Sequence, residues 1–177
     1  MTEIIVIGDE HDTALERLIK GSLSATYRIL YIKGNSFSDI GAGYELVIHD
    51  SERPRLCGIC SSVIVAKRSA VLDGVIPADS TVIVSADRQA QLDAVRKSGA
   101  FAVECGLSPT STVSFSSESD DTLVISLNRS MCALSGKEIQ PLEFPVEKRG
   151  SDSYTLMSFT ALRLLLDDRD SSLGKLL

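Results

Sequence analysis

Short runs of β-branched and aliphatic residues alternate with segments of helical periodicity over the first two thirds of the chain. Runs such as Glu3–Gly8 and Thr81–Ser85 are continuous and apolar, as is typical of strands that are buried on both faces. Further strand candidates are Tyr27–Lys33, Tyr44–His49, Ser62–Lys67 and Phe101–Glu104. Because strands that alternate with helices form parallel sheets with right-handed crossovers, this pattern predicts an α/β domain.

Two segments between these strands have the spacing of amphipathic helices. His11–Leu23 places its apolar residues on one helical face, and either Asp9 or Asp12 is a candidate for its cap. The second helix is predicted to begin at a capping Asp87 and to run to Ser98. Gly99 follows directly, as expected of a residue that ends a helix.

After residue 110 the pattern changes. Thr112–Ser116 and Thr122–Asn128 both alternate, which predicts an antiparallel hairpin, and Glu138–Val146 contains two prolines that restrict it to a sheet edge. Ser153–Asp167 is predicted to be a helix. The expected fold is therefore a three-layer Rossmann or P-loop-like domain, mostly parallel, with an antiparallel hairpin at one edge. Its expected parts are a parallel core over 1–110, a hairpin and edge extension of the same domain over 111–150, a packing helix over 151–170 and a frayed tail over 171–177.

Composition excludes several classes of protein. The 177 residues carry a net charge of -6, which argues against nucleic-acid binding because phosphate neutralisation needs a basic face. No apolar run approaches the roughly 18 residues that a membrane span requires. The four cysteines are too few and too unevenly spaced for a secreted disulfide scaffold. We therefore expect a cytoplasmic protein with reduced thiols and no nucleic-acid or membrane partner.

Polar side chains follow most of the predicted strands. Ligands of open α/β sheets bind outside the carboxyl ends of the strands, so these positions form the candidate site. The candidate cluster comprises Asp9, His11, His49, Asp50, Lys67 and Asp87. If its carboxylates and histidines converge, they could hold a divalent cation as a cofactor or perform acid–base chemistry. The alternative is that loops are polar and that aspartates cap helices without any ligand.

The turn after the first strand does not have the composition of a phosphate-binding loop. Such a loop wraps phosphate with glycine amides and supplies a lysine. The segment Gly8–Thr13 has one glycine, no lysine and three acids. Its field would repel a triphosphate, so ATP hydrolysis by the usual loop is not expected.

Cys57 and Cys60 form a C-x-x-C motif. A dithiol of this kind becomes redox-active when its first thiol lies at a helix N-terminus, but a strand pattern follows here. Cys105 and Cys132 stand apart and do not complete a four-cysteine zinc site. Structural thiols and a dithiol redox sensor both remain open as interpretations.

The order of these segments resembles the central, ATP-binding domain of the Mur ligases. In that family a strand runs into G-T-N-G-K-T and then a helix, whereas here Asp12 stands at the position of the phosphate-binding lysine. The strand Val82–Arg88 is similar to the family's strand ending in N-A-D-D, with Ser85 in place of the asparagine, and Val103–Ser108 is similar to a later strand. Phe115–Leu127 would be the closing hairpin. The resemblance implies a truncated relative that keeps the fold and has lost the ATP-binding residues.

This resemblance predicts a non-catalytic binding or regulatory domain, with a small molecule or a cell-wall precursor as its ligand. Two alternatives are a small metal-dependent enzyme that uses the strand-end cluster and a sensor that uses Cys57 and Cys60. A homodimer is a further possibility, formed through the edge at Ile139–Val146 or through Leu164 and Leu165 of the last helix.

Overall fold

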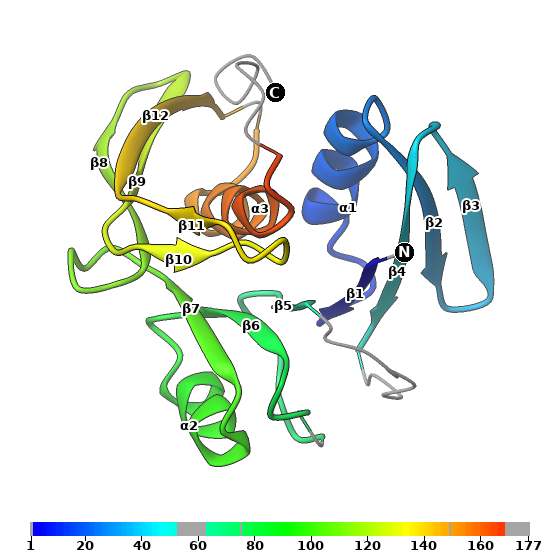
Figure 1. Cartoon of the computed structure of the whole chain (residues 1–177), viewed down its shortest axis with the longest axis horizontal. Coiled ribbons are helices and arrows are strands. Elements are labelled where there is room, and N and C mark those ends of the chain that lie inside the picture. Colours follow the sequence, from blue (N-terminus) through cyan, green and yellow to red (C-terminus); the bar gives the residue numbers. More distant parts are fainter. Residues whose placement is uncertain (1, 53–62, 75, 149, 169–177) are drawn as a thin grey trace.

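The computed structural model describes residues 2–52, 63–74, 76–148 and 150–168 (Figure 1). Its helices are α1 (Ala14–Leu18), which continues as the π-helical turn η1 (Ile19–Leu23), α2 (Gln89–Ser98) and α3 (Ser153–Leu165). Its strands are β1 (Thr2–Ile7), β2 (Tyr27–Lys33), β3 (Ser36–Ile40), β4 (Tyr44–Ser51), β5 (Val63–Ala66), β6 (Thr81–Ser85), β7 (Phe101–Cys105), β8 (Val113–Glu118), β9 (Thr122–Leu127), β10 (Met131–Cys132), β11 (Glu138–Ile139) and β12 (Leu142–Glu147).

Ten of these strands form one mixed sheet in the order β12-β9-β8-β7-β6-β5-β1-β4-β2-β3. The strands from β8 to β2 run parallel, while β9 and β12 at one end and β3 at the other are antiparallel to their neighbours. The α/β class, the parallel core and the antiparallel hairpin are thus confirmed. Pro145 lies on the edge strand β12, as the sequence predicted, because proline cannot donate to a further strand.

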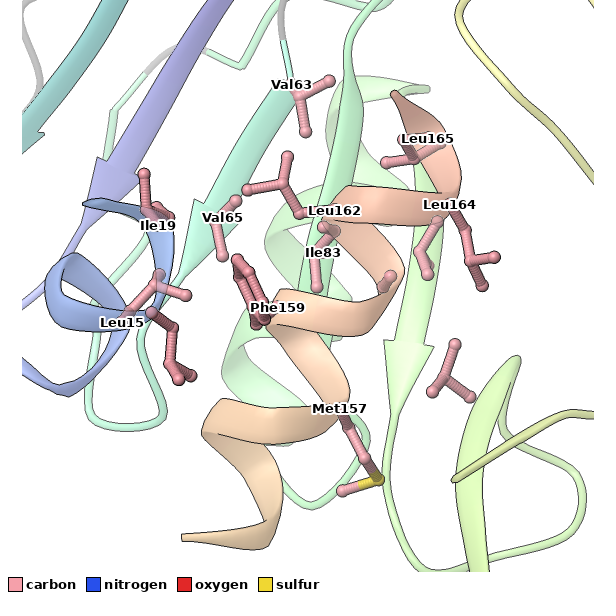
Figure 2. Packing of buried hydrophobic residues seen from close by; sticks show 14 of the residues in the cluster. Leu15, Ile19, Val63, Val65, Ile83, Met157, Phe159, Leu162, Leu164 and Leu165 are labelled. Carbon is pink, nitrogen blue, oxygen red and sulfur yellow. The ribbon is translucent and has the colours of Figure 1, made fainter. Parts of the chain in front are cut away.

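The sheet is covered on both faces. α1 and α3 pack on one face, where α3 contacts α1, β5, β6, β7 and β8, while α2 packs on β6 and β7 from the other face. The larger core cluster lies under α1 and α3, and a smaller cluster lies under α2. Figure 2 shows the larger cluster, in which Phe159 and Leu162 of α3 lie near Val65 and Ile83 of the sheet. Three layers therefore form, as expected.

The helix α3 is buried along its whole length, which corrects one expectation. Leu164 and Leu165 are each 1% exposed within the single chain, so they cannot form the dimer surface suggested by the sequence. The two-stranded β10–β11 sheet and the end of the main sheet around β8, β9 and β12 lie beside α3 and help to enclose it (Figure 1). A helix that is apolar around most of its circumference is buried for this reason.

Two other local predictions differ from the structure. Asp87 does not cap α2, because the cap position is Arg88 and the Asp87 carboxylate lies 3.6 Å from Arg68 instead. The strand β3 was not predicted, since its five residues Ser36–Ile40 are mostly polar. The end of α2 is as expected, with Gly99 in the left-handed conformation at φ 75°.

Within the described part of the chain, no helix is both long and apolar enough to cross a lipid bilayer.

Candidate functional site

Three of the six predicted site residues meet at the carboxyl ends of β1, β4 and β5. Asp9 follows β1, Asp50 is near the end of β4, and Lys67 follows β5. These strands are neighbours, with Ile7 opposite both Ser51 and Ala66. Parallel pairing therefore brings the three positions to one edge of the sheet, where ligands of open α/β sheets bind.

Lys67 lies at the centre of this group and is only 3% exposed. Its Nζ donates hydrogen bonds to the backbone oxygens of Asp9 at 2.7 Å and Asp12 at 2.9 Å. It also lies 3.0 Å from Oδ1 and 3.2 Å from Oδ2 of Asp50. The three donors of one ammonium group are thus satisfied by the loop after β1 and by a buried carboxylate.

The stem of Lys67 passes directly under Gly8. Gly8 has a φ of 143°, and a Cβ at this position would lie 2.6 Å from the Cβ of Lys67. This close approach and this backbone conformation both require glycine. The buried side chain of Lys67 therefore holds the loop after β1 in its conformation.

The Asp50 carboxylate has two further neighbours on β2. The Tyr31 hydroxyl donates a hydrogen bond of 2.8 Å to Oδ2 of Asp50, and Lys33 Nζ lies 3.9 Å from the same oxygen. Burial raises the pKa of Tyr31, and the charge of Asp50 raises it further, so this hydroxyl remains a proton donor. The buried charge on Asp50 is compensated by Lys67 and Tyr31, as a buried carboxylate requires.

A second carboxylate, Glu16 of α1, connects this group to the helix above it. Lys33 and Lys20 donate hydrogen bonds to Glu16 at 2.8 and 2.7 Å. Burial alone would raise the pKa of Glu16, but the hydrogen bonds from Lys20 and Lys33 outweigh it and lower this pKa. Lys20 also lies 4.7 Å from the centre of the Tyr31 ring. We call the five side chains of Glu16, Tyr31, Lys33, Asp50 and Lys67 the buried polar network.

The turn between β1 and α1 supplies acceptors for its own backbone amides. Oδ1 of Asp9 accepts a hydrogen bond of 2.8 Å from the amide of His11. Oδ1 of Asp12 accepts one of 3.1 Å from the amide of Ala14, the first residue of α1. Two amides that a phosphate-binding loop would direct at its ligand are thus already bonded to carboxylates of the same turn.

The other three predicted site residues do not join this group. His49 points to the opposite face of the sheet from its neighbour Asp50, because side chains alternate along a strand, and its Nε2 lies 3.5 Å from Glu3. His11 is exposed on the turn after β1, and Asp87 pairs with Arg68. Among the described residues, no three His, Cys, Asp or Glu side chains lie close enough together to hold a metal ion.

A cavity of about 380 Å³ opens beside the turn. It is lined by Gly8, Asp9, Glu52, Ser69, Ala70, Val71 and Asp73. Three of the described lining residues, Asp9, Glu52 and Asp73, are acidic, and their charges disfavour a polyphosphate, since like charges repel at short range.

Sequence reasoning missed four residues that hold this edge together. Glu16, Tyr31 and Lys33 belong to the buried polar network, and Gln91 of α2 fastens the segment after β5. Gln91 Nε2 donates to the backbone oxygens of Lys67 and Ala70 at 3.1 and 3.0 Å, and its Oε1 accepts from the Ser85 amide at 3.0 Å. The alternation of β2 was the available signal, because it places Tyr31 and Lys33 on the face that α1 covers.

Neither of the two described cysteines, Cys105 and Cys132, joins this group. Cys57 and Cys60 lie outside the described residues, so the dithiol interpretation stays a prediction. Cys105 is buried at the end of β7, and burial raises the pKa of its thiol, which keeps it protonated and unreactive. Cys132 is exposed on β10.

The arrangement of the sheet and helices is similar to that in several solved structures of ligases. The chain is similar to a murein peptide ligase from Psychrobacter arcticus, with a TM-score of 0.55 and 14% identity over 92% of this chain and 43% of that one. It is also similar to the structure of a UDP-N-acetylmuramoyl-L-alanyl-D-glutamate–2,6-diaminopimelate ligase, with a TM-score of 0.59 and 13% identity over 99% of this chain and 45% of that one.

A third similar structure is that of E. coli FolC in complex with DHPP and ADP, with a TM-score of 0.53 and 14% identity over 92% of this chain and 52% of that one. The chain thus spans about half the length of these proteins or less. No protein-family model matches the sequence, and no curated protein is significantly similar to it. At these identities, the likeness shows the fold alone.

Proposed function

We propose that this chain is a Mur-ligase-like domain that binds a ligand or a partner in the cytoplasm without hydrolysing ATP. The observation that carries the proposal is that amide and carbonyl groups of the turn after β1 already form hydrogen bonds within the chain. Its amides at His11 and Ala14 are bonded to Asp9 and Asp12, and its carbonyl groups are bonded to Lys67.

Binding of a polyphosphate would have to displace these internal contacts. A phosphate-binding turn works because its amides are free and a lysine is available to the β- and γ-phosphates. Lys67 is the nearest cation to the turn in the described contacts, but moving its ammonium to a ligand would leave Asp50 buried with less compensation. Such a change costs several kcal/mol, in the range of about 3–5 for breaking a buried ion pair.

The similar structures suggest which ligands to test first. Two of the three similar enzymes named above are ligases of murein peptides or of UDP-N-acetylmuramoyl peptides. We propose a cell-wall precursor of this class as the small-molecule ligand. The cavity beside Gly8 supports an amine-bearing part of such a molecule over its diphosphate, because three of its described lining residues are acidic.

Calorimetric titration with ATP and Mg²⁺, together with a phosphate-release assay, tests the first part of the proposal. The wild-type chain is expected to show no saturable binding and no turnover. The double variant Asp9→Gly/Asp12→Lys frees two amides and adds a cation, so we expect it to gain measurable ATP binding. Asp120→Gly/Asp121→Lys is the matched control, since it makes the same two substitutions and the same charge change in the turn between β8 and β9. Saturable ATP binding by the wild-type chain would contradict the proposal.

Thermal-shift measurements with UDP-N-acetylmuramate and its peptide derivatives test the second part. The midpoint of unfolding should rise with ligand concentration, because a ligand that binds only the native state stabilises it. If none of these compounds shifts the midpoint, the proposed class of ligand is wrong. That result leaves the proposed absence of ATP hydrolysis unaffected, because the titration with ATP and the phosphate-release assay test it separately.

A further inference from the structure

The strand β3 forms one end of the ten-stranded sheet, beyond β2. It pairs with β2 through Ile40, Asp39, Ser38, Phe37 and Ser36. No other described strand lies on its outer side. Phe37 is 77% exposed, so this strand presents a large apolar side chain to solvent.

The hairpin geometry determines which backbone groups of β3 face outward. Only Gly34 and Asn35 separate β2 from β3, and Gly34 has the positive φ, 53°, that a type II′ turn requires at its first position. The pair that flanks a two-residue turn exchanges both of its hydrogen bonds, and such pairs alternate along an antiparallel ladder. Lys33 and Ser36 form that pair, so Phe37 and Asp39 direct their N–H and C=O groups away from β2.

The two ends of the sheet differ in how they resist further pairing. The outer strand β12 exposes Glu143, Pro145 and Glu147, and proline and charged residues are the usual protection of an edge strand. β3 has no proline, and its one charge, Asp39, is held by Arg28 through two hydrogen bonds of 3.0 and 2.6 Å. The end at β3 is therefore open to another strand.

We propose that β3 pairs with β3 of a second copy of this chain, antiparallel and around a two-fold axis at Ser38. In this register Phe37 lies opposite Asp39 of the second copy, and the reverse pair forms by symmetry. All four outward N–H and C=O groups of Phe37 and Asp39 then bond across the interface. The two sheets join into one continuous sheet, and the edge is removed.

The side chains of this register fit each other. No two like charges face one another across the two-fold axis, and each phenyl ring lies against an ion pair of Asp39 and Arg28, whose guanidinium group is attracted to an aromatic face. The two Phe37 rings are diagonal neighbours on one face, within reach of each other. A register centred on Asp39 would oppose two carboxylates, which destabilises a cross-strand pair.

Sedimentation equilibrium over a wide range of protein concentration, combined with a pair of substitutions at Phe37, tests this interface. The wild-type chain is expected to dimerise reversibly. Phe37→Asp places a carboxylate opposite Asp39 at both symmetric positions, and we expect it to weaken the dimer by about tenfold or more. Phe37→Lys also removes the ring, but it places an ammonium group opposite Asp39, so it should dimerise clearly better than Phe37→Asp.

Leu107→Asp is the control, because Leu107 is an exposed apolar residue, 64% exposed, after β7 and far from β3 along the sheet. It should leave the dimer unchanged. Circular dichroism checks that each variant is folded. A wild-type chain that stays monomeric, or a dimer that Phe37→Asp and Phe37→Lys affect equally, would overturn the proposal.

Discussion

A single buried lysine fixes the loop at the end of the first strand. Lys67 bonds to two backbone oxygens of the turn and to Asp50, and Asp50 is 1% exposed. A charge of this kind is stable in the interior only while its partner remains. The position of Lys67 therefore couples the conformation of the turn to the stability of the whole chain.

Substitution of Lys67 by methionine keeps most of the side-chain volume but leaves the Asp50 carboxylate with less compensation. We expect a loss of about 3–5 kcal/mol in the free energy of unfolding, which is the cost of breaking one half of a buried ion pair. Urea denaturation followed by circular dichroism measures this loss. The double variant Lys67→Met/Asp50→Leu should recover part of it, because the unpaired charge is then gone. Equal losses in the single and double variants would show that the charge of Asp50 is not the cause.

The ionisation of Glu16 makes the stability that the buried polar network provides depend on pH. Its pKa in the folded chain is lowered from the ordinary value of 4.5, so the folded state binds a proton less readily than the unfolded state. Its contribution to stability is therefore complete above about pH 5 and is lost as the pH falls through 4.5 toward the lower folded pKa. Replacement by Gln removes this titration. The stability difference between wild type and Glu16→Gln should shrink on acidification from pH 6 to below 4, as measured by urea midpoints at each pH. A constant difference would contradict the assignment.

At the scale of elements, the junction of β1 and α1 depends on the close approach of Gly8 to Lys67. Gly8→Ala places a methyl group within 2.6 Å of the Lys67 Cβ at a φ of 143°. We expect a loss of about 2 kcal/mol or more, since both the contact and the backbone conformation are unfavourable. Gly21→Ala is the matched control, because nothing lies within 4 Å of the added methyl group in η1. Thermal unfolding should show a lower midpoint for the first variant and an unchanged or higher midpoint for the second.

The elements with strong apolar patterns were predictable from the sequence, and weakly patterned ones were not. The continuous runs of β1 and β6 and the glycine stop of α2 follow from local rules, and the structure has them. β3 was missed because Ser36–Ile40 contains few apolar residues and gains its stability from pairing with β2. The prediction that Asp87 caps α2 was wrong because the Asp87 carboxylate pairs with Arg68, which is distant in the sequence.

The location of the candidate site was predictable from the sequence, but the set of residues that form it was not. Asp9 and Lys67 follow β1 and β5, and Asp50 lies near the end of the neighbouring parallel strand β4, so the strand order alone brings them to one edge. The sequence shows that His49 and Asp50 face opposite sides of β4, because side chains alternate along a strand, but it does not show which of the two lies on the face that α1 covers. Tyr31 and Lys33 were missed since they lie within β2 rather than after it.

At the scale of the whole molecule, one core cluster extends across the sheet from Ile29 of β2 to Val146 of β12. The fully buried helix α3 lies within this cluster and contacts α1 as well as β5, β6, β7 and β8. Residues from the first and last thirds of the chain thus share one interior. We therefore expect a single domain.

A single domain of this kind should unfold in one cooperative transition at both ends of the sheet. The chain has no tryptophan, so Val47→Trp in β4 and Phe115→Trp in β8, both at half-buried positions, provide separate fluorescence reporters. Their urea midpoints should coincide. Leu162→Ala removes a side chain of α3 that is 0% exposed and should lower both midpoints together, at a cost of about 2–5 kcal/mol. Leu134→Ala, at a position 39% exposed, should change both only slightly. If Leu162→Ala shifts the β8 reporter and leaves the β4 reporter in place, the two ends of the sheet unfold independently, and α3 does not join them into one unit.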